Sequence, residues 1–280
     1  MSIYRNHTQS PGNLPDASAI PQHYHISACT HEGKVRTVNE DNFTVNGIIG
    51  LEEGQRRSLR GRGMRAPLVC AVFDGTGGAA AGVGAARLAA EYATWLYSSY
   101  VKSPSDRERL INRYVGECNA GILSRYYSCQ GSRGATTFAM AMLNGGRLHV
   151  YSLGDSRLYL CTGGRLYLVT NDHTVAMERF RSGVYTREQA QHSADRHKLT
   201  GFFGMEPADA ARAEKYDTIH TVTGDSLLLC TDGLYSMLSD SEIADVLLSG
   251  SADKARELID LAVMRGGRDN VTCVVIDCAE

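Results

Sequence analysis

Short hydrophobic runs, many of them alternating with polar positions, recur along most of the chain. Runs of roughly four to eight residues rich in β-branched and aromatic side chains are typical of β-strands. The predicted strands are 43–45, 68–73, 136–143, 147–153, 157–161, 165–169, 226–230 and 271–276. The turn sequences Asn144-Gly145-Gly146 and Thr162-Gly163-Gly164 join neighbouring runs, so we expect much of the sheet structure to be antiparallel.

Two longer segments, 82–100 and 106–127, carry hydrophobic residues at the spacing of one helix face. The first stripe is Leu88, Tyr92, Leu96 and Tyr100, and the second is Leu110, Tyr114, Cys118, Ile122 and Tyr126. Shorter helices are predicted at 239–248 and 252–265, with Ser251 as the cap of the second. Helices combined with antiparallel strand pairs indicate an α+β fold, with two sheets packed together and helices outside them.

The composition is ordinary for a globular protein, with 43% hydrophobic residues, 21% charged residues and a net charge of −2. We therefore expect no nucleic-acid partner and no membrane partner, because no apolar run approaches the ~18–20 residues of a membrane span. Residues 1–22 are polar and contain three prolines, so a flexible lead-in is predicted. No linker interrupts residues 23–280, which should form one domain, and no signal peptide is evident, so a cytoplasmic protein is expected.

The eight cysteines stand singly and form no Cys-x-x-Cys pair. Buried thiols in a reducing compartment are therefore predicted rather than a disulfide framework. His23 and His25 form a lone His-x-His pattern, for which surface or capping roles are expected. No group of histidines or thiols thus competes with oxygen ligands for a metal ion.

Acidic residues stand at the ends of several predicted strands. Asp74 and Asp232 follow strands and precede glycines, Asp155 lies in a turn, Asp269 directly precedes the last strand, and Glu40 and Asp41 precede an early one. Each alone is ordinary turn chemistry. Together, however, such strand ends converge at one edge of the sheet core, where unpaired carboxylates would repel one another. A hard divalent cation such as Mg²⁺ or Mn²⁺ would relieve that repulsion.

Eight short motifs, in order along the chain, then match one known family. They are Arg36-Thr-Val-Asn39-Glu40-Asp41, Phe73-Asp74-Gly75-Thr76-Gly77-Gly78, Gly134-Ala-Thr136-Thr137, Gly154-Asp155-Ser156-Arg157, Asn171-Asp172-His173, Leu199-Thr200-Gly201-Phe-Phe-Gly204, Thr231-Asp232-Gly233 and Gly267-Arg268-Asp269-Asn270. On these motifs the chain resembles the metal-dependent type 2C serine/threonine protein phosphatases, most closely the compact bacterial form. The resemblance spans about residues 24–277.

The resemblance implies a central β-sandwich flanked by helical layers, with a binuclear Mn²⁺ or Mg²⁺ centre and a third, weaker metal. By the same resemblance, Asp74 bridges two metals and the Gly75 carbonyl binds one of them. Asp232 and Asp269 hold the other metal, and Glu40 acts at the second metal. Asp155 helps to hold the third metal, and Arg36 binds the substrate phosphate. A metal-bound water would be the nucleophile. Asp41 matches as well, either as a hydrogen-bonding support or as a ligand.

One departure concerns the proton for the leaving group. Thr76 stands where many eukaryotic relatives have a histidine proposed as the general acid, so a metal-bound water is expected to supply that proton. His173 is another candidate, although a hydrogen-bonded structural role is favoured for it. Residues 174–197 correspond to the variable flap of the family, whose arginines either contact phosphopeptide or form a solvated face. These are Arg179, Arg181, Arg187 and Arg196.

The segment 55–65, QRRSLRGRGMR, has five arginines in eleven residues and is predicted to be a loop between two strands. It is either a solvated loop or a docking patch for acidic or phosphorylated partners.

The leading hypothesis is an active, monomeric phosphatase for phosphoserine and phosphothreonine proteins that are substrates of a serine/threonine kinase. An inactive relative that captures phosphoproteins is disfavoured, because no metal-binding aspartate is lost. A phosphatase for a small phosphorylated metabolite stays open, since the motifs recognise phosphate and not its carrier.

Overall fold

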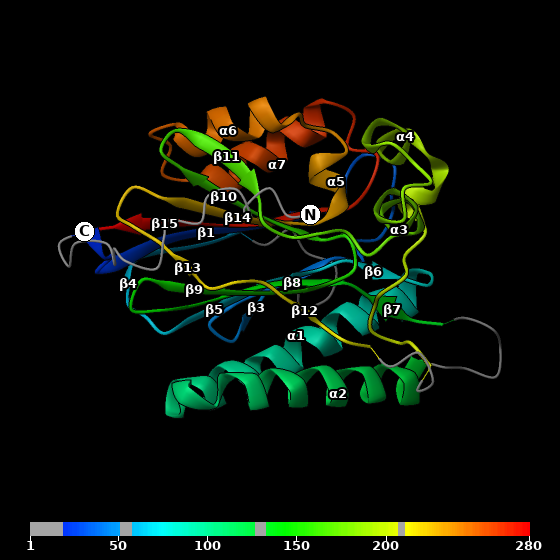
Figure 1. Ribbon diagram of the computed structural model, residues 1–280, viewed down its shortest axis with the longest axis horizontal. Helices are drawn as coiled ribbons and strands as arrows, with labels where there is room; N and C mark the ends of the chain where they lie inside the picture. The colour runs from blue at the N-terminus through cyan, green and yellow to red at the C-terminus, as the bar shows by residue number, and fades with distance from the viewer. Residues whose placement is uncertain (1–18, 51–57, 127–132, 207–210) are drawn as a thin grey trace.

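Two antiparallel sheets packed face to face form the centre of the protein, and helices cover both outer faces (Figure 1). The computed structural model describes residues 19–50, 58–126, 133–206 and 211–280. Most of the predicted lead-in, residues 1–18, lies outside the described residues. The layer order helix–sheet–sheet–helix confirms the predicted α+β sandwich.

Over the described residues the first sheet has six strands, all joined by antiparallel pairing. Their order is β11 (Arg165–Leu168), β10 (Arg157–Thr162), β14 (Ser226–Cys230), β15 (Val271–Ala279), β1 (His23–His31) and β4 (Ser58–Met64). The pair β1 and β15 runs in continuous register from His23 opposite Ala279 to His31 opposite Val271. The two ends of the described chain are thereby fixed within this sheet.

The second sheet has seven strands in the part of the chain that the structure describes. Its order is β12 (Glu214–Lys215), β9 (Arg147–Leu153), β8 (Phe138–Asn144), β5 (Leu68–Phe73), β2 (Asn42–Val45) and β3 (Ile48–Ile49), and β13 (Ile219–His220) also pairs with β9. A small ladder joins β6 (Gly75–Thr76) to β7 (Ala135–Thr136) beyond the end of β5. Every residue of β5 is buried, because the other sheet covers one of its faces and helices cover the other.

Two long helices, α1 (Ala79–Lys102) and α2 (Arg107–Tyr126), cover the second sheet, with the short helix η3 (Pro104–Asp106) between them. The first sheet is covered by α6 (Asp240–Leu248) and α7 (Lys254–Met264). The other helices of the described residues are α3 (Val175–Arg181), α4 (Arg187–His192), η4 (Ala194–His197) and α5 (Asp232–Tyr235). All four lie at one end of the sandwich (Figure 1).

The helices predicted from a hydrophobic stripe are present, but one predicted N-cap residue was wrong. Ser239 begins α6 with a capping box in which Glu242 is the reciprocal partner. The cap of α7, however, is Asp253, whose carboxylate accepts from Arg256 N, so the prediction of Ser251 was wrong. The Ser251 hydroxyl instead accepts from Asp253 N, in the turn just before the helix.

The arginine-rich segment is a strand, not a loop, over the residues that the structure describes. Residues 58–64 form β4 at the edge of the first sheet, with a register shift where Gly63 has φ +63°. Arg60 lies on the face toward α7, with its Nε 3.8 Å from Asp253 Oδ2. Arg56 and Arg57 lie outside the described residues. A bulged, positively charged edge resists pairing with another strand, which accounts for such a sequence at this position.

Within the described residues no helix is both long enough and apolar enough to cross a bilayer. The seven cysteines that the structure describes are all buried thiols, as predicted, and Cys129 lies outside the described residues.

An aromatic cluster ties the second sheet to its helices. The rings of Phe138 and Phe203 stack with centroids 5.0 Å apart, and Tyr114 of α2 meets each of them edge-on at 5.7 Å. All three side chains are fully buried. Phe203 belongs to the segment that follows α3 and α4, so this cluster also anchors the return of the chain from that region.

We predict that Phe138→Ala lowers the free energy of unfolding by about 3–5 kcal/mol, because it leaves a cavity in this stack. Urea denaturation followed by circular dichroism measures the change. The control Val184→Ala, at a side chain that is 66% exposed, should change it by less than about 0.5 kcal/mol. Equal effects of the two substitutions would contradict the role of the cluster.

Candidate active site

Four turns that carry aspartates meet at the end of the sandwich where α5 and β6 lie (Figure 1). Asp74 follows β5, Asp155 lies between β9 and β10, Asp232 is the first residue of α5, and Asp269 precedes β15. Burial raises the pKa of Asp74 well above its usual range, and the nearby charges of Asp41, Asp232, Asp155 and Asp269 raise it further. The predicted convergence of these carboxylates is thus present in the fold.

Asp74 and Asp232 influence one another, since the charge of Asp232 raises the pKa of Asp74. Burial and the charge of Asp269 raise the pKa of Asp232, while His197, Asp74 and Arg36 lower it. Asp155, only 7% exposed, has its pKa raised by burial and by Asp232. Each carboxylate is therefore destabilised as an anion by the same enclosure and by its neighbours.

The loop between β1 and β2 brings Arg36 and Glu40 to this cluster. Arg36 Nη2 donates to Asp269 Oδ2 at 2.9 Å, and the arginine side chain is 54% exposed. Glu40 Oε2 is buried without a hydrogen-bond partner and faces Gly82, where a Cβ atom would lie 1.8 Å from it. Burial raises the pKa of Glu40, and the Arg36 charge partly offsets the increase. An orphaned carboxylate oxygen at this position is a ready ligand.

Asn270 holds that loop in place, although the motif analysis gave it no role. Its Oδ1 accepts from Glu40 N at 2.9 Å, and its Nδ2 donates to the carbonyls of Glu32 and Val38 at 3.0 and 2.8 Å. One buried amide thus fastens both sides of the loop to the start of β15. A neutral amide that bonds three backbone groups was not detectable from the spacing of acidic residues.

Buried threonine hydroxyl groups form hydrogen bonds with the aspartates of the site. Thr231 Oγ1 donates to Asp41 Oδ2 at 2.8 Å, so one oxygen of Asp41 is engaged in the core. Burial raises the pKa of Asp41 to about 8, although hydrogen bonds from Thr231 and Thr272 lower it. Thr137 accepts from Asp74 N at 3.2 Å and shares a 2.7 Å hydrogen bond with Ser156. These hydroxyls orient the aspartate turns without adding charge.

The donor set fits a hard divalent cation. The groups at this edge are carboxylate oxygens, one of them orphaned, and several are held close together against their mutual repulsion. No group of three His, Cys, Asp or Glu side chains in the described part of the chain is arranged to hold an ion by itself. Mg²⁺ and Mn²⁺ retain several waters and accept backbone carbonyls, so one or two carboxylates per ion suffice.

Comparison with known families then decides the identity. The family model described as protein phosphatase 2C matches residues 60–261. The chain belongs to the protein phosphatase 2C family. It is therefore a protein phosphatase, as the motif resemblance predicted.

Individual relatives agree with this assignment. The serine/threonine phosphatase stp of Listeria welshimeri is 29% identical over 260 residues, which cover 90% of this chain and 95% of that protein. The solved serine/threonine phosphatase of S. agalactiae has a TM-score of 0.77 and 26% identity, covering 92% of this phosphatase and all of that chain. The catalytic domain of PstP, solved with two manganese ions, has a TM-score of 0.72 and 28% identity, covering 92% and 100%.

His173 is held at both ring nitrogens in this phosphatase. Its Nδ1 accepts from Gly154 N at 2.9 Å, which leaves the proton on Nε2 to be donated to Glu214 Oε2 at 2.9 Å. Burial raises the pKa of Glu214, but hydrogen bonds from His173, Tyr216 and Asn171 lower it to about 2 overall. This arrangement favours the structural role that the sequence suggested for His173. Glu214 itself carried no sequence signal.

The flap consists of α3, α4 and η4, and its arginines have partners within the chain. Arg179 pairs with Asp195, Arg181 lies 3.9 Å from Glu214, Arg187 lies over the Phe180 ring at 5.3 Å, and Arg196 donates to the Gln191 carbonyl at 2.9 Å. The Thr186–Gln189 capping box begins α4. These contacts explain the charged composition of the flap without a bound peptide.

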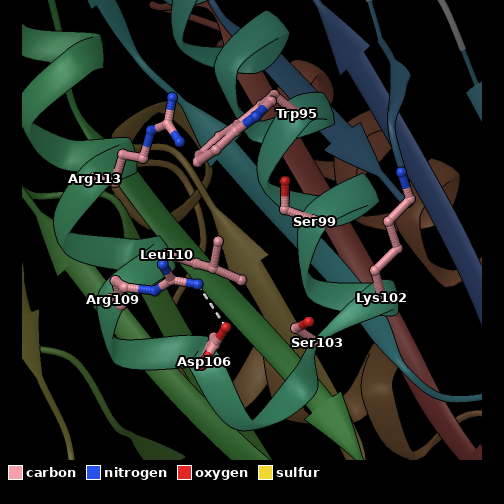
Figure 2. Close-up of a pocket in the computed structure, with 8 residues that line it drawn as sticks. All are labelled: Trp95, Ser99, Lys102, Ser103, Asp106, Arg109, Leu110 and Arg113. Atoms are coloured by element: carbon pink, nitrogen blue, oxygen red, sulfur yellow. Dashed lines mark hydrogen bonds and ion pairs between the residues drawn. The ribbon is translucent and has the colours of Figure 1, made fainter.

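A pocket of about 330 Å³ lies elsewhere, between α1 and α2 (Figure 2). Arg113 covers the Trp95 ring at 4.7 Å, and Arg109 donates to Asp106 at 2.6 Å. None of its lining residues belongs to the acidic cluster, and two of its three cations are engaged by neighbours, since Arg113 also bonds Glu117. This pocket is not the active site.

We predict that Asp74→Asn stabilises the metal-free protein at pH 8. Because the folded-state pKa of Asp74 is raised, ionisation of this group costs stability. The cost grows as the pH rises from the unfolded-state pKa toward the folded-state pKa, and it is absent below the unfolded-state pKa. Removing the charge should raise Tm by about 2–4 °C at pH 8, equivalent to about 1 kcal/mol, with a smaller gain at pH 5.

Thermal unfolding gives the Tm of each variant, first in the presence of a chelator and then with Mn²⁺. Mn²⁺ should raise the Tm of the original protein and have much less effect on the Asp74→Asn variant. Asp260→Asn, an exposed position on α7, is the matched control and should behave like the original protein. A destabilised Asp74→Asn variant that keeps the full Mn²⁺ response would contradict the metal site.

Proposed function

We propose that this phosphatase removes phosphate from serine and threonine side chains of proteins in a metal-dependent reaction, with residues 23–280 as one catalytic domain. The observation that carries the proposal is the convergence of Asp74, Asp155, Asp232 and Asp269 at one sandwich edge, beside the half-exposed Arg36. The relatives named as serine/threonine phosphatases support the choice of substrate.

In this proposal Asp74, the Gly75 carbonyl, Asp232, Asp269 and Glu40 hold two cations, and Asp155 helps to hold a third, weaker one. Mn²⁺ or Mg²⁺ fits this oxygen-only set, and the two manganese ions of PstP support the pair. Bound cations would neutralise phosphate charge and lower the pKa of an attacking water. A side chain at Gly75 is excluded, because its Cβ would lie 2.4 Å from the Glu40 carbonyl.

The residues of the chain supply binding and alignment, which phosphoryl transfer requires more than covalent help. The Arg36 guanidinium is held by Asp269 through one nitrogen, and its exposed remainder is free to donate a fork of N–H groups to phosphate oxygens. Behind it, Asn270 fixes the backbone of Glu40 and Thr231 fixes the carboxylate of Asp41. The hydroxyl of Thr76, exposed on β6, is too weak an acid to protonate the leaving alkoxide, so in this proposal a metal-bound water would supply that proton.

We further propose that the substrates are phosphoproteins produced by a serine/threonine kinase, and that the phosphatase acts as a cytoplasmic monomer. A retained set of carboxylates argues against a purely phosphoprotein-binding role, since such a role does not require a metal site.

Hydrolysis of p-nitrophenyl phosphate and of a phosphothreonine peptide tests the proposal. Both should require Mn²⁺ or Mg²⁺, and Asp74→Asn and Asp232→Asn should lower kcat/KM by about a thousandfold. Arg36→Ala should lower kcat/KM by about 10–100-fold through lost phosphate binding. The exposed Asp260→Asn is again the control.

Full activity in chelator, or in the Asp74→Asn variant, would overturn metal-dependent catalysis. Faster turnover of small phosphometabolites than of phosphopeptides would overturn the protein substrate while leaving the metal site intact. Tight phosphopeptide binding without phosphate release would instead establish a capture protein.

A further inference from the structure

Behind Asp155 lies a second layer of side chains that the metal-site roles do not include. Arg157, two residues further along β10, donates from Nε and Nη2 to the two oxygens of Asp172 at 2.9 and 2.7 Å. Its guanidinium carbon lies 3.6 Å from the centre of the Tyr235 ring. Side-chain exposures of 21% for Arg157 and 13% for Asp172 show that this pair is largely shielded from water.

Tyr235 connects this layer to the carboxylates. It is the last residue of α5, the helix that Asp232 begins, and its hydroxyl donates to the backbone carbonyl of Asp155 at 3.0 Å. The ring therefore contacts the arginine while the hydroxyl fixes the turn that presents Asp155. Two proposed ligands from different strand ends, Asp155 and Asp232, are joined by this one side chain.

The same layer reaches the base of the flap. Asp172 immediately precedes His173. The Nδ1 atom of His173 accepts from Gly154 N, and His173 N donates to the Gly154 carbonyl, each at 2.9 Å. Thr174 then caps α3. The Asp155 turn, the start of the flap and the end of α5 are thus bound to one another around a single shielded guanidinium.

We propose that Arg157, Asp172 and Tyr235 form a positioning unit that holds Asp155 at the geometry needed for the weaker cation. This inference rests on the proposed function, because it presupposes a metal at Asp155. The proposal gives none of the three a contact with substrate, so they are positioning residues and not catalytic ones. Residues that orient metal ligands from behind typically change metal affinity about 10–100-fold when altered.

Tyr235→Phe isolates the critical contact, because it removes the hydroxyl that bonds Asp155 and keeps the ring that covers Arg157. Tyr159→Phe is the matched control, since the Tyr159 hydroxyl accepts from Arg157 Nη1 at 3.0 Å and belongs to the same cluster. Both variants lose one hydroxyl next to the same arginine. No hydrogen bond to the Asp155 turn is lost in the control.

Mn²⁺ binding, measured by calorimetry without substrate, provides a readout that does not depend on activity. Tyr235→Phe should weaken the lowest-affinity class of Mn²⁺ sites about 10-fold and leave the tighter sites within about twofold. Tyr159→Phe should change all sites by less than about twofold, because Asp172 still holds two nitrogens of Arg157. The activity of Tyr235→Phe should fall at limiting Mn²⁺ and recover at saturating Mn²⁺, with KM for a phosphopeptide unchanged.

Asp172→Asn is a second variant, which weakens the anchor of Arg157 and should shift the same sites in the same direction. Unchanged Mn²⁺ binding in both Tyr235→Phe and Asp172→Asn, while the original protein binds Mn²⁺, would overturn the positioning unit and leave the proposed function standing. An equal loss in Tyr159→Phe would also overturn it, since the effect would then be general loosening. Absence of Mn²⁺ binding by the original protein would overturn both.

Discussion

The mutual repulsion of carboxylates at one edge of the sandwich is the constraint on which this site depends. Burial and neighbouring charges raise the pKa values of Asp41, Asp74, Asp155 and Asp232, so each is costly to hold as an anion. Such a cluster persists only because the folding energy of the two sheets and their helices outweighs that cost. A protein that merely needed turns at these positions would not concentrate charge in this way.

The rigidity of the two sheets makes this concentration of negative charge possible. β5 and β14 are completely buried, and the carboxylates follow directly where these strands end. Strand ends cannot move far without breaking the ladders behind them, so the aspartates are held against repulsion. The loop that carries Arg36 and Glu40 is less regular, and there Asn270 supplies the fixation that a strand supplies elsewhere.

Sequence reasoning recovered the parts of the fold that depend on local pattern. The predictions for β5, β9 and β14 match the observed bounds, because β5 and β14 are almost wholly apolar and β9 lies between the Gly145-Gly146 turn and Gly154. It missed β1, where histidine, serine and threonine interrupt the apolar pattern, and it took β4 for a loop because of its arginines. The supporting contacts could not be predicted from local sequence patterns, because the partners are far apart in the chain. Thr231 and Asp41 are 190 residues apart, and Asn270 and Glu40 are 230 apart. Only the folded register brings such pairs together.

The supporting residues are of a type that keeps the electrostatic potential at this edge of the sandwich negative. Neutral hydroxyl and amide groups, such as those of Thr231 and Asn270, can orient acidic side chains without cancelling the field that attracts a cation. A positive charge beside Asp155 would compete with that cation. Arg157 stands nearby, but Asp172 engages two of its nitrogens and itself raises the Asp155 pKa, which opposes the lowering by Arg157. Arg157 can therefore hold the Asp155 turn in place, because Asp172 neutralises most of its positive charge.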